Sequence, residues 1–168
     1  MTELALTTAE PGELDLVLGI LRSAGAARAP VATFSWGSRF PDVERDLPRG
    51  LVHLARVGGR PAGTFVLRWS DEQVWGPDDG DAGYLHRLAT DPDFAGRGIG
   101  AQLIAAAGDL TRARGRHWLR LDCDQANHRL RGYYESLGFG HAGDVPQAPH
   151  GSLPGYLCAA RYQRAVPG

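Results

Sequence analysis

Apolar residues along the chain follow two spacings, and the first is the spacing of β-strands. Seven segments carry short apolar runs or alternate apolar with polar residues, which is typical of strands that bury one or both faces. Gly58 and Gly59 separate two of these segments and predict a tight hairpin turn, because such turns need positive φ. The predicted strands are Leu4–Leu6, Leu51–Val57, Ala62–Trp69, Gly83–Thr90, Trp118–Cys123, Phe139–Val145 and Tyr156–Arg164.

Other segments repeat apolar residues every three or four positions, which is the spacing of amphipathic helices. This pattern predicts helices over Thr8–Ser23, Gly98–Arg114 and Asn127–Leu137, and prolines limit a further short helix to about Asp42–Leu47. The acidic segment 70–81, which contains glycine and proline, is predicted to be a loop. The expected buried stripe of the helix over 98–114 is Ile99, Leu103, Ala106, Ala107 and Leu110.

Length and composition narrow the class of protein. A chain of 168 residues fits one domain over 1–168, and the mixture of strands and helices predicts an α/β fold. The net charge of −1 argues against a general binder of nucleic acid or anionic membranes. Since no apolar run approaches the roughly 20 residues of a membrane helix, we expect a cytoplasmic protein. Cys123 and Cys158 lie in apolar strand contexts and indicate neither a disulfide framework nor a metal site.

The segment from Leu85 to Ala101 runs from an apolar strand through a proline-marked turn into a glycine-rich helix start. The first backbone N–H groups of a helix have no partner inside it, and the helix dipole adds positive charge there. Such an end binds anionic oxygens, and glycines let the backbone approach them closely. The segment therefore predicts a pyrophosphate site, although a glycine-rich turn built only for close packing gives the same short motif.

A second signal follows at Asn127 and at Tyr133-Tyr134-Glu135-Ser136-Leu137-Gly138-Phe139. With the glycine segment, it resembles the GNAT superfamily of acyl-CoA-dependent N-acetyltransferases over nearly the whole chain. Gly98 and Gly100 occupy the glycine places of that family's pyrophosphate loop, Gln/Arg-x-x-Gly-x-Gly/Ala. Ala95 departs from its first place, where neighbouring Arg97 could supply a cation.

The resemblance implies the GNAT fold, an α/β fold with a mixed central sheet of about six to seven strands flanked by about four helices. It implies that backbone groups of the strand near Leu88, Ala89 and Thr90 bond the pantetheine arm of acetyl-CoA, the co-substrate. It also implies that backbone amides of the glycine loop hold the pyrophosphate; the residues of this loop are Ala95, Gly96, Arg97, Gly98, Ile99, Gly100 and Ala101.

The resemblance gives two residues of the following helix a role, and each has a structural alternative. Asn127 matches a pantetheine-contacting asparagine, but at a helix start it could equally be an N-cap. Tyr134 matches the tyrosine that protonates the departing CoA thiolate, and the alternative is a core aromatic residue.

His86 lies in the strand where many GNAT enzymes carry a glutamate base. An imidazole can accept the proton of an attacking ammonium group, directly or through water, although a histidine in a strand can also be purely structural. Alternation within the strand places Tyr84, His86, Leu88 and Thr90 on one face. Arg87 is then expected on the opposite face, where it needs a carboxylate partner or solvent.

Three weaker candidates surround this site. Acidic residues of the loop, from Asp71 to Asp81, could attract a cationic amine, although such runs are usually solvated. Arg129 and Arg131 could meet the phosphates of CoA or form a solvated face. Three tryptophans could line an acceptor pocket or serve packing: Trp36, Trp69 and Trp75.

Together these observations predict an N-acetyltransferase that moves an acetyl group from acetyl-CoA to a primary amine of a small molecule or peptide. The attack is expected to be direct, in a ternary complex, without a metal and by a monomer or homodimer. The alternative is an acyl-CoA-binding sensor or partner-dependent module with this fold and no turnover, which Ala95 favours. A P-loop phosphotransferase is excluded because no Gly-Lys-Ser/Thr follows the glycines.

Overall fold

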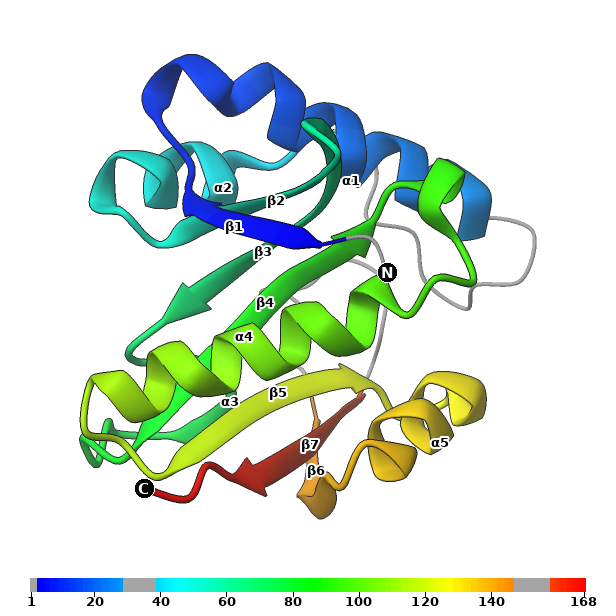
Figure 1. The fold of residues 1–168 in the computed structure, drawn as a ribbon. Coiled ribbons are helices and arrows are strands. Elements are labelled where there is room, and N and C mark those ends of the chain that lie inside the picture. Colours follow the sequence, from blue (N-terminus) through cyan, green and yellow to red (C-terminus); the bar gives the residue numbers. More distant parts are fainter. Residues whose placement is uncertain (1–2, 29–38, 147–157) are drawn as a thin grey trace. The chain divides into compact units, whose positions relative to one another are not determined.

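The computed structural model describes residues 3–28, 39–146 and 158–168 (Figure 1). Within these residues, seven strands form one mixed sheet in the order β1-β2-β3-β4-β5-β7-β6. The β1–β2, β2–β3, β5–β7 and β6–β7 pairs are antiparallel, whereas β4 and β5 run parallel. The strands are β1 (Leu4–Thr8), β2 (Val52–Val57), β3 (Arg60–Arg68), β4 (Ala82–Thr90), β5 (Trp118–Asp124), β6 (Gly140–Pro146) and β7 (Cys158–Ala165).

In the described parts of the chain, five α-helices and three short 3₁₀ turns connect these strands, so the predicted α/β class and mixed sheet are confirmed. The helices are α1 (Leu14–Arg28), α2 (Pro41–Asp46), α3 (Glu72–Trp75), α4 (Ile99–Ala113) and α5 (His128–Ser136). The 3₁₀ turns are η1 (Pro11–Glu13), η2 (Leu47–Arg49) and η3 (Pro92–Phe94).

The described residues group into two compact units. The first unit holds 3–28, 39–68 and 85–107, and the second holds 69–84, 108–146 and 158–168. Strand β4 contributes to both, because its residues up to Tyr84 belong to the second unit and those from Leu85 to the first.

The first unit is built on the β1-β2-β3 meander, with α1 packed against β3 (Figure 1). Gly58 and Gly59 form the predicted turn of the β2–β3 hairpin, with φ of 57° and 79°. Gly63 of β3 lets α4 approach closely, because a Cβ there would lie 2.7 Å from Leu103 Cδ1 and 3.1 Å from the Ala89 carbonyl oxygen. The start of α4 is thereby packed directly against the strands.

The second unit is built on β5, β7 and β6, with β5 pairing in parallel with the first residues of β4. The side chain of Tyr162 on β7 is fully buried, and its ring lies 6.3 Å from that of Tyr134 on α5. This contact fixes α5 against the end of the sheet that carries β6 and β7 (Figure 1).

Two predictions about the bounds and types of elements were wrong in detail. The first helix begins at Leu14 after the η1 turn rather than at Thr8, because Thr8 pairs with His53 in the sheet. Pro11 then starts the turn, and the backbone N–H of Glu10 bonds the side chain of Glu13. A short helix, α3, lies within the predicted loop.

The buried stripe of α4 is rotated relative to the prediction. Ile104 and Thr111 are fully buried, whereas Ala106 and Leu110 are half-buried. Ile99, Leu103 and Ala107 are buried as expected. The shift of one position shows that helical spacing alone leaves the centre of a buried face uncertain by about one residue.

Candidate functional site

The glycine segment follows β4 as a well-defined reversal of the chain. Asp91 begins it, and its carboxylate accepts a hydrogen bond of 2.9 Å from the backbone N–H of Asp93. The backbone N–H of Ala95 donates to the Pro92 carbonyl at 3.1 Å, so this donor is committed to the turn. Gly96 and Gly98 follow with φ of 74° and 71°, a conformation that residues with a Cβ adopt only at a cost. The loop therefore needs glycine at both positions.

The same loop offers donors to an anion at the start of α4. Residues 95–98 are exposed, whereas the Ile99 side chain is buried and anchors the helix. The first amides of the 15-residue helix α4 have no partner within it, by the geometry of any helix start. The guanidinium groups of Arg97 and Arg60 each lie 5.2 Å from the Phe94 ring centroid, which places two cations beside the loop. The first unit thus carries an arrangement suited to a pyrophosphate.

Strand β4 is continuous, but its residue Arg87 has an unusual backbone conformation. Its φ is 52°, in the left-handed region, although it lies in the middle of a strand. The predicted common face for His86, Leu88 and Thr90 assumed unbroken alternation, and a left-handed residue interrupts that alternation. Ala89 is fully buried, and Leu88 and Thr90 are half-buried.

Of the two predicted environments for the Arg87 side chain, a carboxylate partner or solvent, the structure shows the carboxylate partner. Its Nε and Nη2 each donate a 3.0 Å hydrogen bond to the two oxygens of Asp42 on α2. The guanidinium also lies 5.1 Å from the Phe40 ring centroid. Burial alone would raise the pKa of Asp42, but the bonds and charge of Arg87, with the charge of Arg68, outweigh it and lower that pKa.

In the second unit, Asn127 and Tyr134 lie at the two ends of α5. The side-chain oxygen of Asn127 accepts a 3.1 Å bond from the Leu130 N–H, so Asn127 acts as the N-cap of this helix. The Tyr134 side chain is 8% exposed, and its ring lies 5.8 Å from Phe139. Both structural alternatives are therefore realised, and neither excludes a contact with a ligand.

Sequence reasoning missed a hydrogen-bonded cluster of Tyr162, Arg131 and Glu135, whose Tyr162 ring lies beside that of Tyr134. The Tyr162 hydroxyl donates to Glu135 Oε1 at 2.8 Å and accepts from Arg131 Nε at 2.9 Å. Arg131 also donates to the Gln125 carbonyl at 3.1 Å, so it serves α5 and is not simply a solvated side chain. Burial raises the pKa of Tyr162, which keeps its hydroxyl protonated. The spacing of Arg131 and Glu135, four apart on one helix face, was the available signal.

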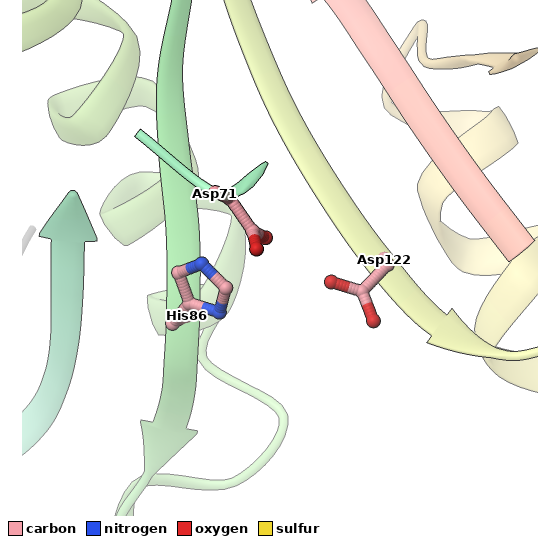
Figure 2. Close-up of side chains that lie close together, drawn as sticks. All are labelled: Asp71, His86 and Asp122. Atoms are coloured by element: carbon pink, nitrogen blue, oxygen red, sulfur yellow. The ribbon is translucent and has the colours of Figure 1, made fainter. Parts of the chain in front are cut away.

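His86 on β4, in the first unit, is half-buried. In the second unit, Asp122 lies on β5 and Asp71 precedes α3 (Figure 2). Within the second unit, Asp71 and Asp122 have carboxylate oxygens within 4.8 Å of each other. Asp122 was not predicted as a candidate. Its position between the buried residues Leu121 and Cys123 places it on the polar face of β5, which was the signal that could have found it.

Three carboxylates of the acidic loop, in the second unit, form ion pairs or hydrogen bonds with basic side chains. Arg116 pairs with Asp78 at 3.3 Å, Arg120 pairs with Asp79 at 3.2 Å, and His117 bonds Asp81. These three carboxylates therefore have structural partners, and their attraction of a cationic amine stays a prediction. Trp36 lies outside the described residues.

The other two candidate tryptophans, Trp69 and Trp75, stack with arginines of the second unit. The guanidinium groups of Arg114 and Arg116 lie 4.4 and 5.4 Å from the Trp69 ring centroid. Those of Arg120 and Arg161 lie 4.9 and 5.2 Å from the Trp75 ring centroid. Cation–π packing accounts for both residues, as the structural alternative proposed.

The sequence model of the acetyltransferase (GNAT) family matches residues 22–139, which include both the glycine loop and α5. The chain belongs to this family. A Bacillus subtilis protein described as the uncharacterized N-acetyltransferase YesJ is 30% identical over 110 residues, which are 61% of this chain. The chain spans 60% of the length of that relative.

Solved structures of GNAT proteins show the same fold. An acetyltransferase from Listeria monocytogenes superposes with a TM-score of 0.76 over 96% of this chain and 94% of its own, at 22% identity. N-acetylglutamate synthase from Neisseria gonorrhoeae, solved with coenzyme A and N-acetyl-glutamate, gives 0.71 over 100% of this chain and 36% of its own, at 15% identity. These similarities establish the GNAT fold for the chain.

Two further observations concern the Cys123 thiol and the character of the helices. Burial raises the pKa of the Cys123 thiol to about 12, so this sulfur is not held as a thiolate at neutral pH. Cys123 therefore lacks the activation that a thiol nucleophile needs. Among the described helices, none combines the length and apolar character needed to cross a bilayer.

Proposed function

We propose that the protein transfers an acetyl group from acetyl-CoA to a primary amine of a small molecule or peptide. The observation that carries the proposal is the exposed Gly96–Gly98 turn at the start of α4, in a chain of the GNAT family. The amine attacks the thioester directly in a ternary complex. The protein acts in the cytoplasm, as a monomer or homodimer, and needs no metal.

In this proposal the first unit binds acetyl-CoA. Backbone amides from Gly96 to Ala101 donate to the pyrophosphate, and Arg97 supplies a cation beside them. The Ala95 N–H, which the resemblance included, is committed to the Pro92 carbonyl. Backbone groups of Leu88, Ala89 and Thr90 bond the pantetheine arm. The similarity to N-acetylglutamate synthase, a structure that contains coenzyme A, supports this assignment.

The departing sulfur and the attacking nitrogen each need a proton transfer. As the amine attacks the carbonyl carbon and the carbon–sulfur bond breaks, the Tyr134 hydroxyl donates a proton to the CoA thiolate. The new amide nitrogen loses its extra proton to water, and Tyr134 regains a proton from water. Asn127 keeps its carboxamide N–H groups for the pantetheine, since its oxygen caps α5. His86 accepts the proton that the ammonium group must lose before attack, directly or through water.

The test is thiol release from acetyl-CoA over a panel of amino acids, polyamines, aminoglycoside-like and nucleoside amines, and short peptides. Tyr134→Phe keeps the packed ring and removes the hydroxyl, so we expect kcat to fall about 100-fold while the Kd of acetyl-CoA changes little. Tyr133→Phe is the matched control, because Tyr133 is the adjacent tyrosine and is 38% exposed; it should keep wild-type kcat.

The outcomes distinguish the transferase from the acyl-CoA-binding sensor and test the acid role of Tyr134. Amine-dependent release that is lost in Tyr134→Phe supports the transferase and identifies its acceptor class. Release that is equal in both variants removes the acid role of Tyr134. Acetyl-CoA binding without release for any amine contradicts the transferase and supports the acyl-CoA-binding sensor.

A further inference from the structure

Arg87 holds a backbone conformation that its residue type disfavours. It is the one non-glycine residue with positive φ in the parts of the chain that the structure describes. In the left-handed region the Cβ of an L-residue crowds the neighbouring carbonyl oxygen, which glycine avoids. Such conformations persist where the surroundings hold them, and they gather at functional sites. Arg87 directly precedes Leu88, the first β4 residue assigned to the pantetheine arm.

The contacts of the Arg87 side chain can keep its backbone in this conformation. Two parallel hydrogen bonds of 3.0 Å join its guanidinium to both oxygens of Asp42, a geometry that fixes direction as well as distance. The Arg87 and Asp42 side chains are 19% and 21% exposed, so the pair is partly shielded from water. The Phe40 ring lies 5.1 Å from the guanidinium carbon.

Asp42 is itself held in place within the first unit. Arg68 Nη2 donates to Asp42 at 3.2 Å, and Arg68 Nε donates to Asp46 at 2.7 Å. The Asp46 side chain is 1% exposed, so this end of the network is anchored in the interior. Asp42 and Arg87 are 45 residues apart in sequence. Their pair of parallel hydrogen bonds, called the fork below, connects α2 to the middle of β4.

We propose that Asp42 is a positioning residue for acetyl-CoA: its fork with Arg87 holds β4 in the conformation that presents the backbone groups of Leu88–Thr90 to the pantetheine arm. The inference rests on the acetyl-CoA site of the proposed function. It assigns a role in acetyl-CoA binding to a residue on α2, outside the glycine loop. A salt bridge that only stabilised α2 would be lost equally in Arg87→Gly and Arg87→Ala, whatever φ the new residue favours at position 87.

Glycine at position 87 separates these two roles, because glycine adopts a φ of 52° without the fork. The experiment is a cycle of Asp42→Ala, Arg87→Gly and the double variant, read by the Kd of acetyl-CoA in calorimetry. We expect Asp42→Ala to weaken binding about tenfold in the parent chain and less than twofold in the Arg87→Gly background. Arg87→Ala keeps the Cβ and loses the fork, so it should also weaken binding about tenfold.

Controls separate positioning from folding. Asp42→Asn keeps the shape of the side chain and one acceptor oxygen. Its Kd for acetyl-CoA should lie between that of the parent chain and that of Asp42→Ala. Arg112→Ala breaks an exposed ion pair with Asp109 and should leave the Kd unchanged. Thermal unfolding of every variant reports whether it is folded at the assay temperature.

Equal losses from Asp42→Ala in both backgrounds would overturn the inference, as would equal Kd values for Arg87→Ala and Arg87→Gly. These results leave amine-dependent thiol release intact, so they do not affect the proposed transferase. Conversely, the expected cycle in a protein that releases no thiol with any amine would support the positioning role and contradict turnover. A parent chain that does not bind acetyl-CoA overturns both.

Discussion

Stability should fall sharply between pH 7.5 and pH 5 because of one buried histidine. The His53 side chain on β2 is 8% exposed, and its ring stacks on Phe65 at 4.9 Å. Burial lowers the pKa of His53 from 6.5 to about 4, because the charged imidazolium loses its hydration. In the unfolded chain the same ring titrates near its ordinary value. Between these two values the unfolded state binds more protons, so acid favours unfolding.

The size of the effect follows from the two pKa values. With 6.5 in the unfolded chain and about 4 in the folded one, proton linkage at pH 5 removes about 2 kcal/mol of the stability present at neutral pH. The loss begins near pH 6.5 and is complete below pH 4. That amount is a substantial fraction of the roughly 5–15 kcal/mol that stabilises an ordinary domain.

The assay is urea unfolding, followed by tryptophan fluorescence, at pH 7.5 and pH 5. His53→Phe is the matched variant, since it keeps an aromatic ring against Phe65 and removes the titrating group. The parent chain should lose about 2 kcal/mol more than this variant between the two pH values. Equal losses would refute the argument, because they would show that His53 does not carry the pH dependence.

Two other substitutions test the site. His86→Ala should lower the transfer rate most at pH values below the pKa of the acceptor amine, where a base is needed; a mutant-to-parent ratio that stays flat from acid to alkaline pH would remove this role. Tyr162→Phe deletes the hydroxyl that joins Arg131 and Glu135, so we expect about 1–2 kcal/mol of destabilisation in thermal unfolding. It should also lower kcat more than acetyl-CoA affinity, and the reverse order would contradict a role in placing Tyr134.

The predictable parts of the fold are those with local causes. The β2–β3 hairpin follows from two apolar runs and the Gly58-Gly59 pair, all within one short stretch of chain. The start of α1 was misplaced because Thr8 has a strand partner, His53, that local helical spacing does not report. The helix α3 was missed because it is a single short turn in a polar segment.

The candidate site divides in the same way. The glycine loop and the start of α5 were found because each is a contiguous motif. The need of Arg87 for a carboxylate or for solvent was also predictable, because a charged residue in a strand must be paired or solvated. Its partner Asp42 was not, since 45 residues separate the two and many carboxylates were available. Tyr162 was missed for the same reason, because its partners lie on another element.

The energetic balance at Arg87 explains why its partner matters. The left-handed conformation costs a non-glycine residue about 1–2 kcal/mol. Isolated surface ion pairs contribute about 0–1 kcal/mol, too little to offset that cost dependably. The fork with Asp42 is bidentate and only about one-fifth exposed, so it exceeds an ordinary surface pair but leaves little surplus. Removing Asp42 therefore leaves the strain of β4 uncompensated at the residue that precedes the proposed pantetheine contacts.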